Sequence, residues 1–462
     1  MPLTLQDQRL LYGIVALNLL LKLTISTDGP LVNDEPFTVY WSQQPLDAFW
    51  KMLRTENNPP LYFLLIKGWS SFTPFTEAWL RVPSAIGSAF IAWPLFRIGH
   101  ALADRWVGAA AALLFTFTTH HHAFAHEVRA YSLLALLTAS GIWWLVRAHS
   151  NDRHCSAWMM LAVIDVLLVY THFFGWLAIG LQVLVAAIAL RSRPLVRQAL
   201  IAGTIAVLGV LPYAWTFLTR VGQSVSEGTW LTTPGWEEPY NMLWRWSNAP
   251  VLVVSFLLLL VLALLRKGWS ETLVRLALVW SMAPLVGLFV LSQWVPLFLD
   301  RYLNFAAPGF ALLVAGTLHH LLSPRRWRPY VLVLPVLAMA TTFDPMRNDD
   351  RDPQAVVAKV NSWCAENCAL QIEPRWYWLN YRTAEDIASL QNASAANAPD
   401  TIADGAGLHI PGGGKPATWV VVDAGSHLDD PGRPWYATLR EEYSAVDSVR
   451  VDRFVQVLRF HD

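Results

Sequence analysis

The sequence predicts an all-α, multi-pass membrane protein of 462 residues with a small α/β soluble domain at its C-terminal end. Hydrophobic residues make up 54% of the chain and charged residues only 15%, whereas soluble globular proteins contain about 25% charged residues. Long apolar runs follow one another up to about Phe343 and stop after Asp344. We therefore expect a membrane part at 1–343 and a soluble domain at 344–462.

The formal net charge of zero is a cancellation between these two parts. Residues 1–343 contain 23 Lys+Arg and 16 Asp+Glu, and residues 344–462 contain 11 and 18, so the net charges are +7 and −7. A basic membrane part joined to an acidic domain indicates that the two face different environments.

We expect eleven membrane-spanning helices, although several of the apolar runs are shorter than the ~20 residues that cross a bilayer comfortably. The runs lie at about 9–25, 81–101, 106–120, 129–147, 157–171, 173–190, 198–218, 250–265, 273–292, 303–322 and 329–343. The first run is not followed by a signal-peptidase site and is expected to remain as an anchor.

Basic residues gather in alternate loops, which orients the chain. These loops contain Arg97, Arg105, Arg147, Arg153, Arg191, Arg193, Arg197, Arg266, Lys267, Arg275, Arg325, Arg326 and Arg328. By the positive-inside rule these loops are cytoplasmic, and the other loops and the C-terminal domain are external. We expect the protein in the inner (plasma) membrane, with its active site on the external, periplasmic side.

This orientation requires the apolar run at 59–72 to lie in the membrane interface instead of crossing it. Just before it, Leu46, Phe49, Trp50 and Leu53 recur at helical spacing with charged residues opposite, as in a helix that lies flat on a membrane. The first external loop is therefore expected to contain interfacial helices.

The C-terminal domain is expected to mix helix and strand. We predict a helix at Pro353–Glu366, strands at Ala369–Ile372, Trp419–Val422 and Val449–Phe460, and a long loop at 391–416. Cys364 and Cys368 either form a disulfide, as an oxidising compartment would allow, or remain independent thiols.

Polar residues of the external loops are the candidates for chemistry. Asp34 and Glu35 are either a solvated loop feature or a catalytic carboxylate pair, and Glu127 with Arg129 forms a second charged pair on the same face. The histidines at 120–122 and 126 suggest either a metal site or polar packing at the interface, and packing is favoured because consecutive helical residues point in different directions.

External cations offer a second kind of site. Arg301, Arg220 and Arg245 either flank helix ends at the headgroup layer or clamp a phosphate, for which the planar guanidinium is well suited. Asp165, near the middle of a predicted span, is expected either to face the bundle interior or to be protonated.

Several segments together resemble the bacterial membrane glycosyltransferases of the GT-C fold. These enzymes are related to dolichyl-phosphate-mannose protein mannosyltransferases and lipid A aminoarabinose transferases. The segments are Asp34-Glu35, Asn57-Asn58-Pro59-Pro60-Leu61-Tyr62, Glu77, Leu80-Arg81-Val82-Pro83-Ser84, His126-Glu127-Val128-Arg129-Ala130-Tyr131-Ser132-Leu133, Tyr170-Thr171-His172-Phe173-Phe174-Gly175 and Asp300-Arg301-Tyr302-Leu303. They occur in the family's order over about two thirds of the chain.

The resemblance implies an inverting transfer of a sugar from a polyprenyl-phosphate donor to a hydroxyl of an envelope lipid, polysaccharide or protein. It places the general base at Asp34, with Glu35 and Glu127 as further catalytic carboxylates. Candidate contacts to the donor phosphate or substrate are Arg129, Arg301, Tyr302, Asn57, Asn58, His121 and Tyr131. We expect the lipid bilayer as a partner, no nucleic acid, no assigned metal ligands and no firm cofactor, although a divalent cation is possible.

Two other functions are compatible with a polytopic protein. A transporter or lipid flippase would use Asp165, Glu127 and the histidines for coupling, but transporters tend to show internal repeats and this sequence shows none. An accessory protein of polysaccharide export would not need both Asp34 and Arg129. The enzyme is therefore the leading hypothesis.

Overall fold

The computed structural model describes residues 3–24, 29–54, 56–150, 155–190, 196–227, 231–322, 327–345, 352–364, 368–381, 416–424, 434–452 and 454–462. Two compact units result. The first comprises Met1–Ser26, Gln44–Phe75 and Trp79–Met346, and the second comprises Thr27–Gln43, Thr76–Ala78 and Arg347–Asp462. The second unit thus includes part of the first predicted external loop.

The first unit is helical. Its elements are α1 (Leu5–Thr24), α3 (Leu46–Met52), α4 (Pro60–Ser70), α5 (Glu77–Phe90), α6 (Ala92–Leu102), α7 (Arg105–Thr116), α8 (Thr119–Ala125), α9 (Tyr131–Ser150), α10 (Cys155–Thr171), α11 (Gly175–Leu184), the π-helix η1 (Val185–Leu190), α12 (Val196–Glu227), α13 (Glu238–Ser247), α14 (Pro250–Leu265), the 3₁₀ helix η2 (Gly268–Ser270), α15 (Thr272–Leu291), the 3₁₀ helix η3 (Asp300–Ala306), α16 (Ala307–Leu321) and α17 (Arg328–Thr341).

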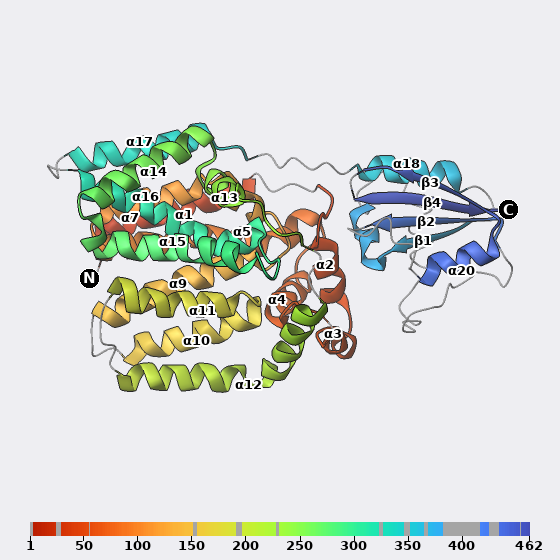
Figure 1. The fold of residues 1–462 in the computed structure, drawn as a ribbon, viewed down its shortest axis with the longest axis horizontal. Helices are drawn as coiled ribbons and strands as arrows, with labels where there is room; N and C mark the ends of the chain where they lie inside the picture. Colours follow the sequence, from red (N-terminus) through yellow and green to blue (C-terminus); the bar gives the residue numbers. More distant parts are fainter. Residues whose placement is uncertain are drawn as a thin grey trace. The chain divides into compact units, whose positions relative to one another are not determined.

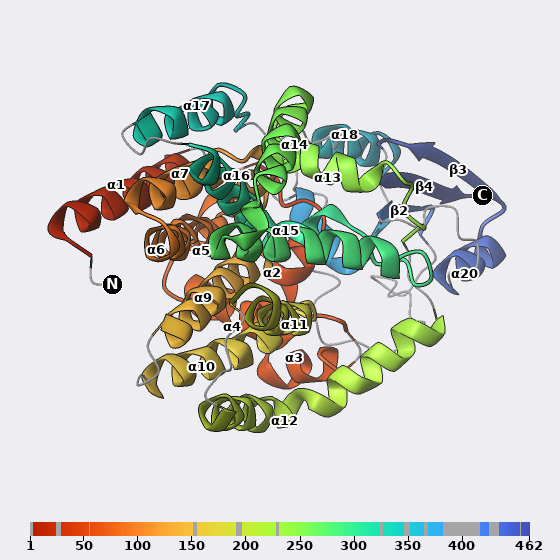
Figure 2. The ribbon, with the colours of Figure 1, turned by 60° about the vertical axis from the view of Figure 1, so that its left-hand side comes forward.

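Two helices form the centre of this bundle. On α7 the side chains of 107–112 and 114–116 are buried, and on α16 those of 307–318 are buried, and the two helices pack against each other. Helices α6, α14, α15 and α17 pack around this pair, and α9, α10 and α12 continue outward in that order (Figure 1). Helix α12, which contains Pro212, is bent part-way along its length (Figure 2), as expected where proline removes a backbone hydrogen bond.

Within the described residues, four helical segments are long and apolar enough to cross a membrane, namely Glu77–Leu102, Tyr131–His149, Leu200–Arg220 and Thr272–Leu291. The pair α13 and α14, bent by 98°, makes a fifth if it counts as one span. The chain is therefore a multi-pass membrane protein. The other predicted runs also form helices, and their crossing of the bilayer stays a prediction.

The bend between α13 and α14 is held by one asparagine. Asn248 has a φ of 64°, in the left-handed region that asparagine tolerates better than most residues. Its side-chain nitrogen Nδ2 donates to the carbonyls of Phe117 at 2.7 Å and Met339 at 3.1 Å. Its side-chain oxygen Oδ1 accepts from the Thr119 amide at 2.9 Å. The bend thereby also fixes the start of α8.

Helices occur where interfacial segments are predicted. The amphipathic pattern at 46–53 forms α3 and the run at 59–72 forms α4. Lys67 donates to the carbonyl of Gln44 at 2.9 Å, and the Trp69 indole donates to the carbonyl of Trp79 at 2.7 Å, so polar atoms pin α4 to its neighbours. The short helix α8 lies within what the sequence presents as a loop.

The second unit is built on a four-stranded sheet of order β1-β2-β4-β3, in which β1 and β2 are parallel and the other neighbours antiparallel. Its elements are α2 (Glu35–Gln43), α18 (Pro353–Trp363), β1 (Cys368–Glu373), the 3₁₀ helix η5 (Arg375–Tyr381), β2 (Thr418–Ala424), α20 (Pro434–Glu442), β3 (Ala445–Arg450) and β4 (Val455–His461).

Helices cover both faces of this sheet. Val420 and Val422 of β2 pack with α18 and η5, and Trp419 and Val421 of the same strand pack with α20 on the other face. Figure 1 shows α18 and α20 on opposite sides of the strands. The alternation follows from the two-residue period of a strand and confirms the predicted mixed α/β character.

One predicted strand is wrong. Val449–Phe460 covers the end of β3, a connection and most of β4, and the two strands pair antiparallel. In the connection the Asp452 carboxylate accepts from the Phe454 amide at 2.6 Å. The predicted helix at 353–366 is confirmed over Pro353–Trp363, and the strands at 369–372 and 419–422 are confirmed. Most of the predicted loop at 391–416 lies outside the described residues. Cys364 and Cys368 form a disulfide.

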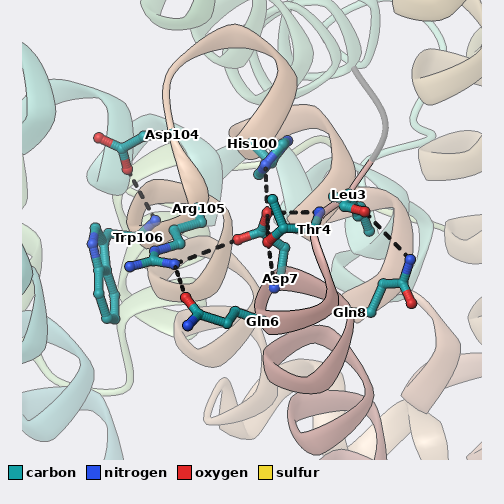
Figure 3. Close-up of polar contacts among 9 residues, drawn as sticks. All are labelled: Leu3, Thr4, Gln6, Asp7, Gln8, His100, Asp104, Arg105 and Trp106. Atoms are coloured by element: carbon teal, nitrogen blue, oxygen red, sulfur yellow. Dashed lines mark hydrogen bonds and ion pairs between the residues drawn. The ribbon is translucent and has the colours of Figure 1, made fainter.

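A polar joint holds the start of α1 against the turn between α6 and α7 (Figure 3). Asp7 accepts hydrogen bonds from the hydroxyl of Thr4 at 2.7 Å and from its amide at 3.1 Å. The same carboxylate lies 3.5 Å from His100 Nε2 and 3.8 Å from Arg105 Nη1. Because the Asp7 side chain is almost fully buried, its loss would leave these donors without their shared acceptor.

We expect Asp7→Ala to lower the apparent melting temperature of the detergent-solubilised protein by several degrees, corresponding to about 1–3 kcal/mol for a lost cap and buried acceptor. The exposed Asp47 on α3 supplies the matched control, and Asp47→Ala should leave the melting temperature nearly unchanged. Equal melting temperatures for the two variants would show that the joint does not stabilise the fold.

Candidate active site

Arg129 lies in the linker between α8 and α9, where neighbouring elements hold both its backbone and its side chain. Its Nη2 donates to Asn58 Oδ1 at 3.0 Å, and its carbonyl accepts a hydrogen bond from Ser84 Oγ at 3.2 Å. The Ser84 hydroxyl also lies 2.6 Å from that of Tyr62. The guanidinium carbon is 5.7 Å from the centroid of the Tyr131 ring at the start of α9.

Arg301 approaches the same tyrosine from a distant part of the sequence. Its guanidinium carbon is 6.0 Å from the Tyr131 centroid and 5.7 Å from that of Tyr302, within the range of cation–π attraction. Arg301 belongs to η3, the 3₁₀ helix that leads into the buried helix α16. Two guanidinium groups therefore meet at one aromatic ring.

Asp300 anchors this end of η3. Its Oδ1 accepts from the Arg301 amide at 2.7 Å, and its Oδ2 lies 3.7 Å from His120 and 3.8 Å from Arg245. Burial alone would raise the pKa of this carboxyl, but His120, Arg245 and the Arg301 amide outweigh burial and hold the pKa below its usual range. Asp300 is thus an ionised, partnered group that positions Arg301.

The turn between α10 and α11 brings a histidine to the same place. His172 has its ring centroid 5.8 Å from that of Tyr131 and 5.8 Å from that of Tyr302. The amide of Phe174 donates to His172 Nδ1 at 3.1 Å. A Cβ on Gly175 would lie 2.2 Å from the carbonyl oxygen of Leu168, so only glycine allows the turn to close this tightly.

His172 is uncharged at neutral pH. Burial lowers the pKa of its imidazole to about 3, and the positive charges of Arg129 and Arg301 add to that effect. The cations at this place are therefore the arginines. We refer to Arg129, Tyr131, His172, Arg301 and Tyr302 as the arginine–aromatic cluster.

The structure thus brings together Arg129, Asn58, Tyr131, Arg301 and Tyr302, five of the residues that the sequence nominates for donor contacts. Asn57 instead accepts a hydrogen bond from Arg220 Nε of α12 at 2.9 Å.

Glu127 is buried, and its backbone carbonyl accepts from the Arg129 amide at 2.8 Å. This backbone contact helps to set the conformation of the linker between α8 and α9.

His121 is fully buried, with both ring nitrogens in contact with neighbours. Nε2 lies 2.6 Å from Ser88 Oγ of α5, and Nδ1 lies 2.9 Å from Asn304 Oδ1 of η3. Burial lowers the pKa of His121 well below its ordinary value and that of His122 to about 2. These contacts favour a bridging role for His121 over the predicted substrate contact.

The histidines of α8 do not form a metal site with other residues of the described ranges. Within those ranges no three His, Cys, Asp or Glu side chains are grouped so that they could hold an ion. His126 contacts the carbonyl of Lys22 at 2.8 Å and that of His122 at 3.1 Å. Polar packing, the second sequence interpretation, describes this helix better.

Asp34 and Glu35 belong to the second unit, at the start of α2. Glu35 is fully buried and its Oε2 accepts from the Val32 amide at 2.8 Å, which resembles the carboxylate arm of a capping box. Asn33 has a φ of 54°, and the carbonyl of Asp34 accepts from the Thr38 amide at 3.2 Å. Of the two carboxylates, Glu35 therefore stabilises the start of α2 through its side chain.

No family model and no curated protein matches the sequence. Among solved structures, ArnT from Cupriavidus metallidurans in the apo state superposes with a TM-score of 0.63 at 12% identity, covering 97% of each chain. The same ArnT bound to undecaprenyl phosphate gives 0.59 at 13% identity, again over 97% of each chain. This chain has the ArnT fold. The full-length match to ArnT confirms the GT-C resemblance at the level of the fold.

The archaeal oligosaccharyltransferase AglB from Archaeoglobus fulgidus, in complex with an inhibitory peptide and a dolichol-phosphate, matches more distantly. Its TM-score is 0.49 at 11% identity, over 82% of this chain and 64% of that chain. The alignment with ArnT, in contrast, extends over 97% of both chains, so it includes the second unit of this chain.

Sequence reasoning did not single out His172, Asp300 or Ser84 as individual members of the site. Each lies within a segment that resembles the family, so the segments were informative although the single roles were not. His172 could have been noticed from its place in a tight helix–helix connection ending in glycine. Nothing in the sequence pairs Ser84 with the Arg129 carbonyl.

We expect Gly175→Ala to disturb the α10–α11 turn, because the added methyl would overlap the backbone of Leu168. The variant should lose several degrees of thermal stability together with much of any activity that depends on His172. Gly180→Ala on α11 is the matched control, since a Cβ there meets nothing within 4 Å. If Gly175→Ala behaves like Gly180→Ala, the close approach does not constrain the turn.

Proposed function

We propose that this protein is a glycosyltransferase that moves a sugar from a polyprenyl-phosphate donor to a hydroxyl of an envelope lipid, polysaccharide or protein, with inversion. The observation that carries the proposal is the convergence of Arg129 and Arg301 on one tyrosine ring, in a chain with the ArnT fold. ArnT has been crystallised with undecaprenyl phosphate, a ligand of the same chemical class as the donor proposed here.

The reaction needs two kinds of protein group. As the bond between the sugar C1 and the phosphate oxygen breaks, its electron pair moves to the leaving oxygen, and the phosphate gains negative charge. Guanidinium groups that are already in position stabilise that charge, so Arg129 and Arg301 are the candidates for this task. The acceptor oxygen bonds to C1 from the opposite face, and its proton passes to a carboxylate.

We assign the proton acceptor to Asp34. The family resemblance places the base there, and the buried hydrogen bond of Glu35 to the Val32 amide gives Glu35 a role in starting α2. Glu35 then supports the conformation of the Asp34 backbone, and Glu127 supports the linker that contains Arg129.

A lipid-linked donor suits a membrane enzyme, because the prenyl tail can remain in the bilayer while the sugar enters from the side. We place α3 and α4 in the interface, the eleven apolar helices across the inner membrane, and the arginine–aromatic cluster on the external face. The supporting features are the amphipathic pattern of α3 and the basic residues in the opposite loops.

Asp34→Asn is expected to reduce sugar transfer by at least about a hundredfold, because general-base catalysis contributes about that much or more. The variant should stay folded and bind undecaprenyl phosphate as the wild type does. Asp47→Asn, an exposed acid on α3, is the control and should keep full activity. Transfer by purified Asp34→Asn at the wild-type rate would exclude Asp34 as the base.

Arg129→Gln is expected to weaken the binding of undecaprenyl phosphate about tenfold or more, because it removes a charge-assisted hydrogen bond to the phosphate. Arg54→Gln is the matched control, since Arg54 is exposed beyond α3. Binding is measured by titration of the purified protein in nanodiscs. If both variants bind like the wild type, the arginine–aromatic cluster is not the phosphate site.

A further inference from the structure

His172 is a buried titratable group to which the proposed reaction assigns no task. We propose that His172 is a neutral hydrogen-bond donor that contacts the phosphate of the polyprenyl-phosphate ligand through Nε2–H, between the two arginines. This inference rests on the proposed function and names a further binding residue of the same site. The inference specifies the tautomer with the proton on Nε2, so substitutions that keep or remove a donor at that position can test it.

The tautomer follows from one hydrogen bond. The Phe174 amide can only donate, and it donates to His172 Nδ1 at 3.1 Å, so Nδ1 carries no proton. A neutral imidazole has one proton on its two nitrogens, and it must therefore be on Nε2. The α10–α11 turn presents an N–H donor on the side of the ring away from the Phe174 amide.

The turn also fixes where that donor can be. The His172 amide donates to the Leu168 carbonyl at 3.2 Å, and the His172 carbonyl accepts from the Gly175 amide at 2.8 Å. Both bonds hold the backbone of the turn, and Gly175 lets it approach Leu168 closely. The imidazole thus has little freedom to move away from its aromatic neighbours.

Those neighbours place the ring beside both guanidinium groups. Tyr131 contacts the His172 ring and lies within about 6 Å of Arg129 and Arg301, and Tyr302 contacts both His172 and Arg301. Phe174 stacks on Tyr302 with ring centroids 4.7 Å apart. Aromatic rings therefore pack against the His172 ring, and two of them also contact the guanidinium groups proposed to bind phosphate.

A neutral donor suits this position better than a third cation. Burial and the two arginines lower the pKa of His172 to about 3, so the imidazole adds no third positive charge beside the guanidinium groups at neutral pH. A neutral N–H adds a hydrogen bond to the phosphate without adding repulsion to the empty site. It also cannot serve as an acid that protonates the leaving phosphate at neutral pH.

Three substitutions at His172 separate its role as a hydrogen-bond donor from its role in packing. Glutamine can place its amide N–H near the position of Nε2, whereas asparagine is shorter and reaches only toward the position of Nδ1. Phenylalanine fills the ring volume without a donor. We expect His172→Phe and His172→Asn to weaken binding of undecaprenyl phosphate about tenfold or more, and His172→Gln to stay within about threefold of the wild type.

The measurement is a titration of the purified full-length protein in nanodiscs with undecaprenyl phosphate, and with undecaprenol as the probe for tail binding alone. Undecaprenol binding should be the same for all His172 variants. Between pH 5.5 and 8, the affinity of the wild type for undecaprenyl phosphate should change only as the phosphate titrates. The affinity of His172→Gln should show the same pH dependence, because a neutral His172 gains no charge in this range.

The outcomes distinguish this inference from the proposed function. If Arg129→Gln weakens phosphate binding but His172→Phe, His172→Asn and His172→Gln all bind like the wild type, the donor role of His172 is wrong and the proposed function stands. A loss of undecaprenol binding in His172→Phe, or an acid-side gain that depends on His172, would equally overturn it. If neither Arg129→Gln nor His172→Phe affects phosphate binding, the proposed function itself fails.

Discussion

The placement of two guanidinium groups against one tyrosine ring is the constraint on which the rest of the first unit depends. Like charges repel strongly in a medium of low dielectric constant, so Arg129 and Arg301 do not converge unless other contacts compel them. Asn58 and Ser84 hold the first arginine, and Asp300 holds the second. The free-energy cost of bringing the two guanidinium groups together is met during folding. The cluster is then organised before a ligand binds, which is the condition for effective electrostatic stabilisation of the developing charge in the proposed reaction.

The sequence predicts local structure well, but it predicts poorly which loops that are distant in the chain lie together in the fold. Apolar runs predict the helices because 3.6-residue and two-residue periodicities are local properties, and the same holds for β1 and β2. Alternation that continues through 449–460 concealed the end of β3 at Arg450 and the start of β4 at Val455, since the short connection at 451–454 barely interrupts the pattern. The short helix α2 went unpredicted because it has little apolar periodicity and begins at a carboxylate that reads as a catalytic candidate.

The same distinction between local and long-range information applies to the candidate site. Arg129 and Arg301 could be nominated from the sequence because charges in loops predicted to be external either are solvated at helix ends or bind a ligand. Their shared contact with Tyr131 could not, because it depends on how η3 and α9 pack in three dimensions. For the histidines of α8 the sequence suggests either a metal site or polar packing and favours packing, and the buried contacts of His121 with Ser88 and Asn304 give that side chain a role in packing.

The burial of most of α7 and α16 has a consequence for how the bundle relates to its lipid environment. An α-helix of twelve residues such as α7 is only about 18 Å long, well short of the ~30 Å hydrocarbon core. A lipid-facing helix of that length would thin the surrounding bilayer or tilt its neighbours. Protein surrounds most of α7 instead, so hydrophobic mismatch acts mainly on helices such as α12, α14 and α17, which carry many exposed apolar side chains. Changes in bilayer thickness should thus reach the outer helices first, while the central pair that supports η3 is insulated from them.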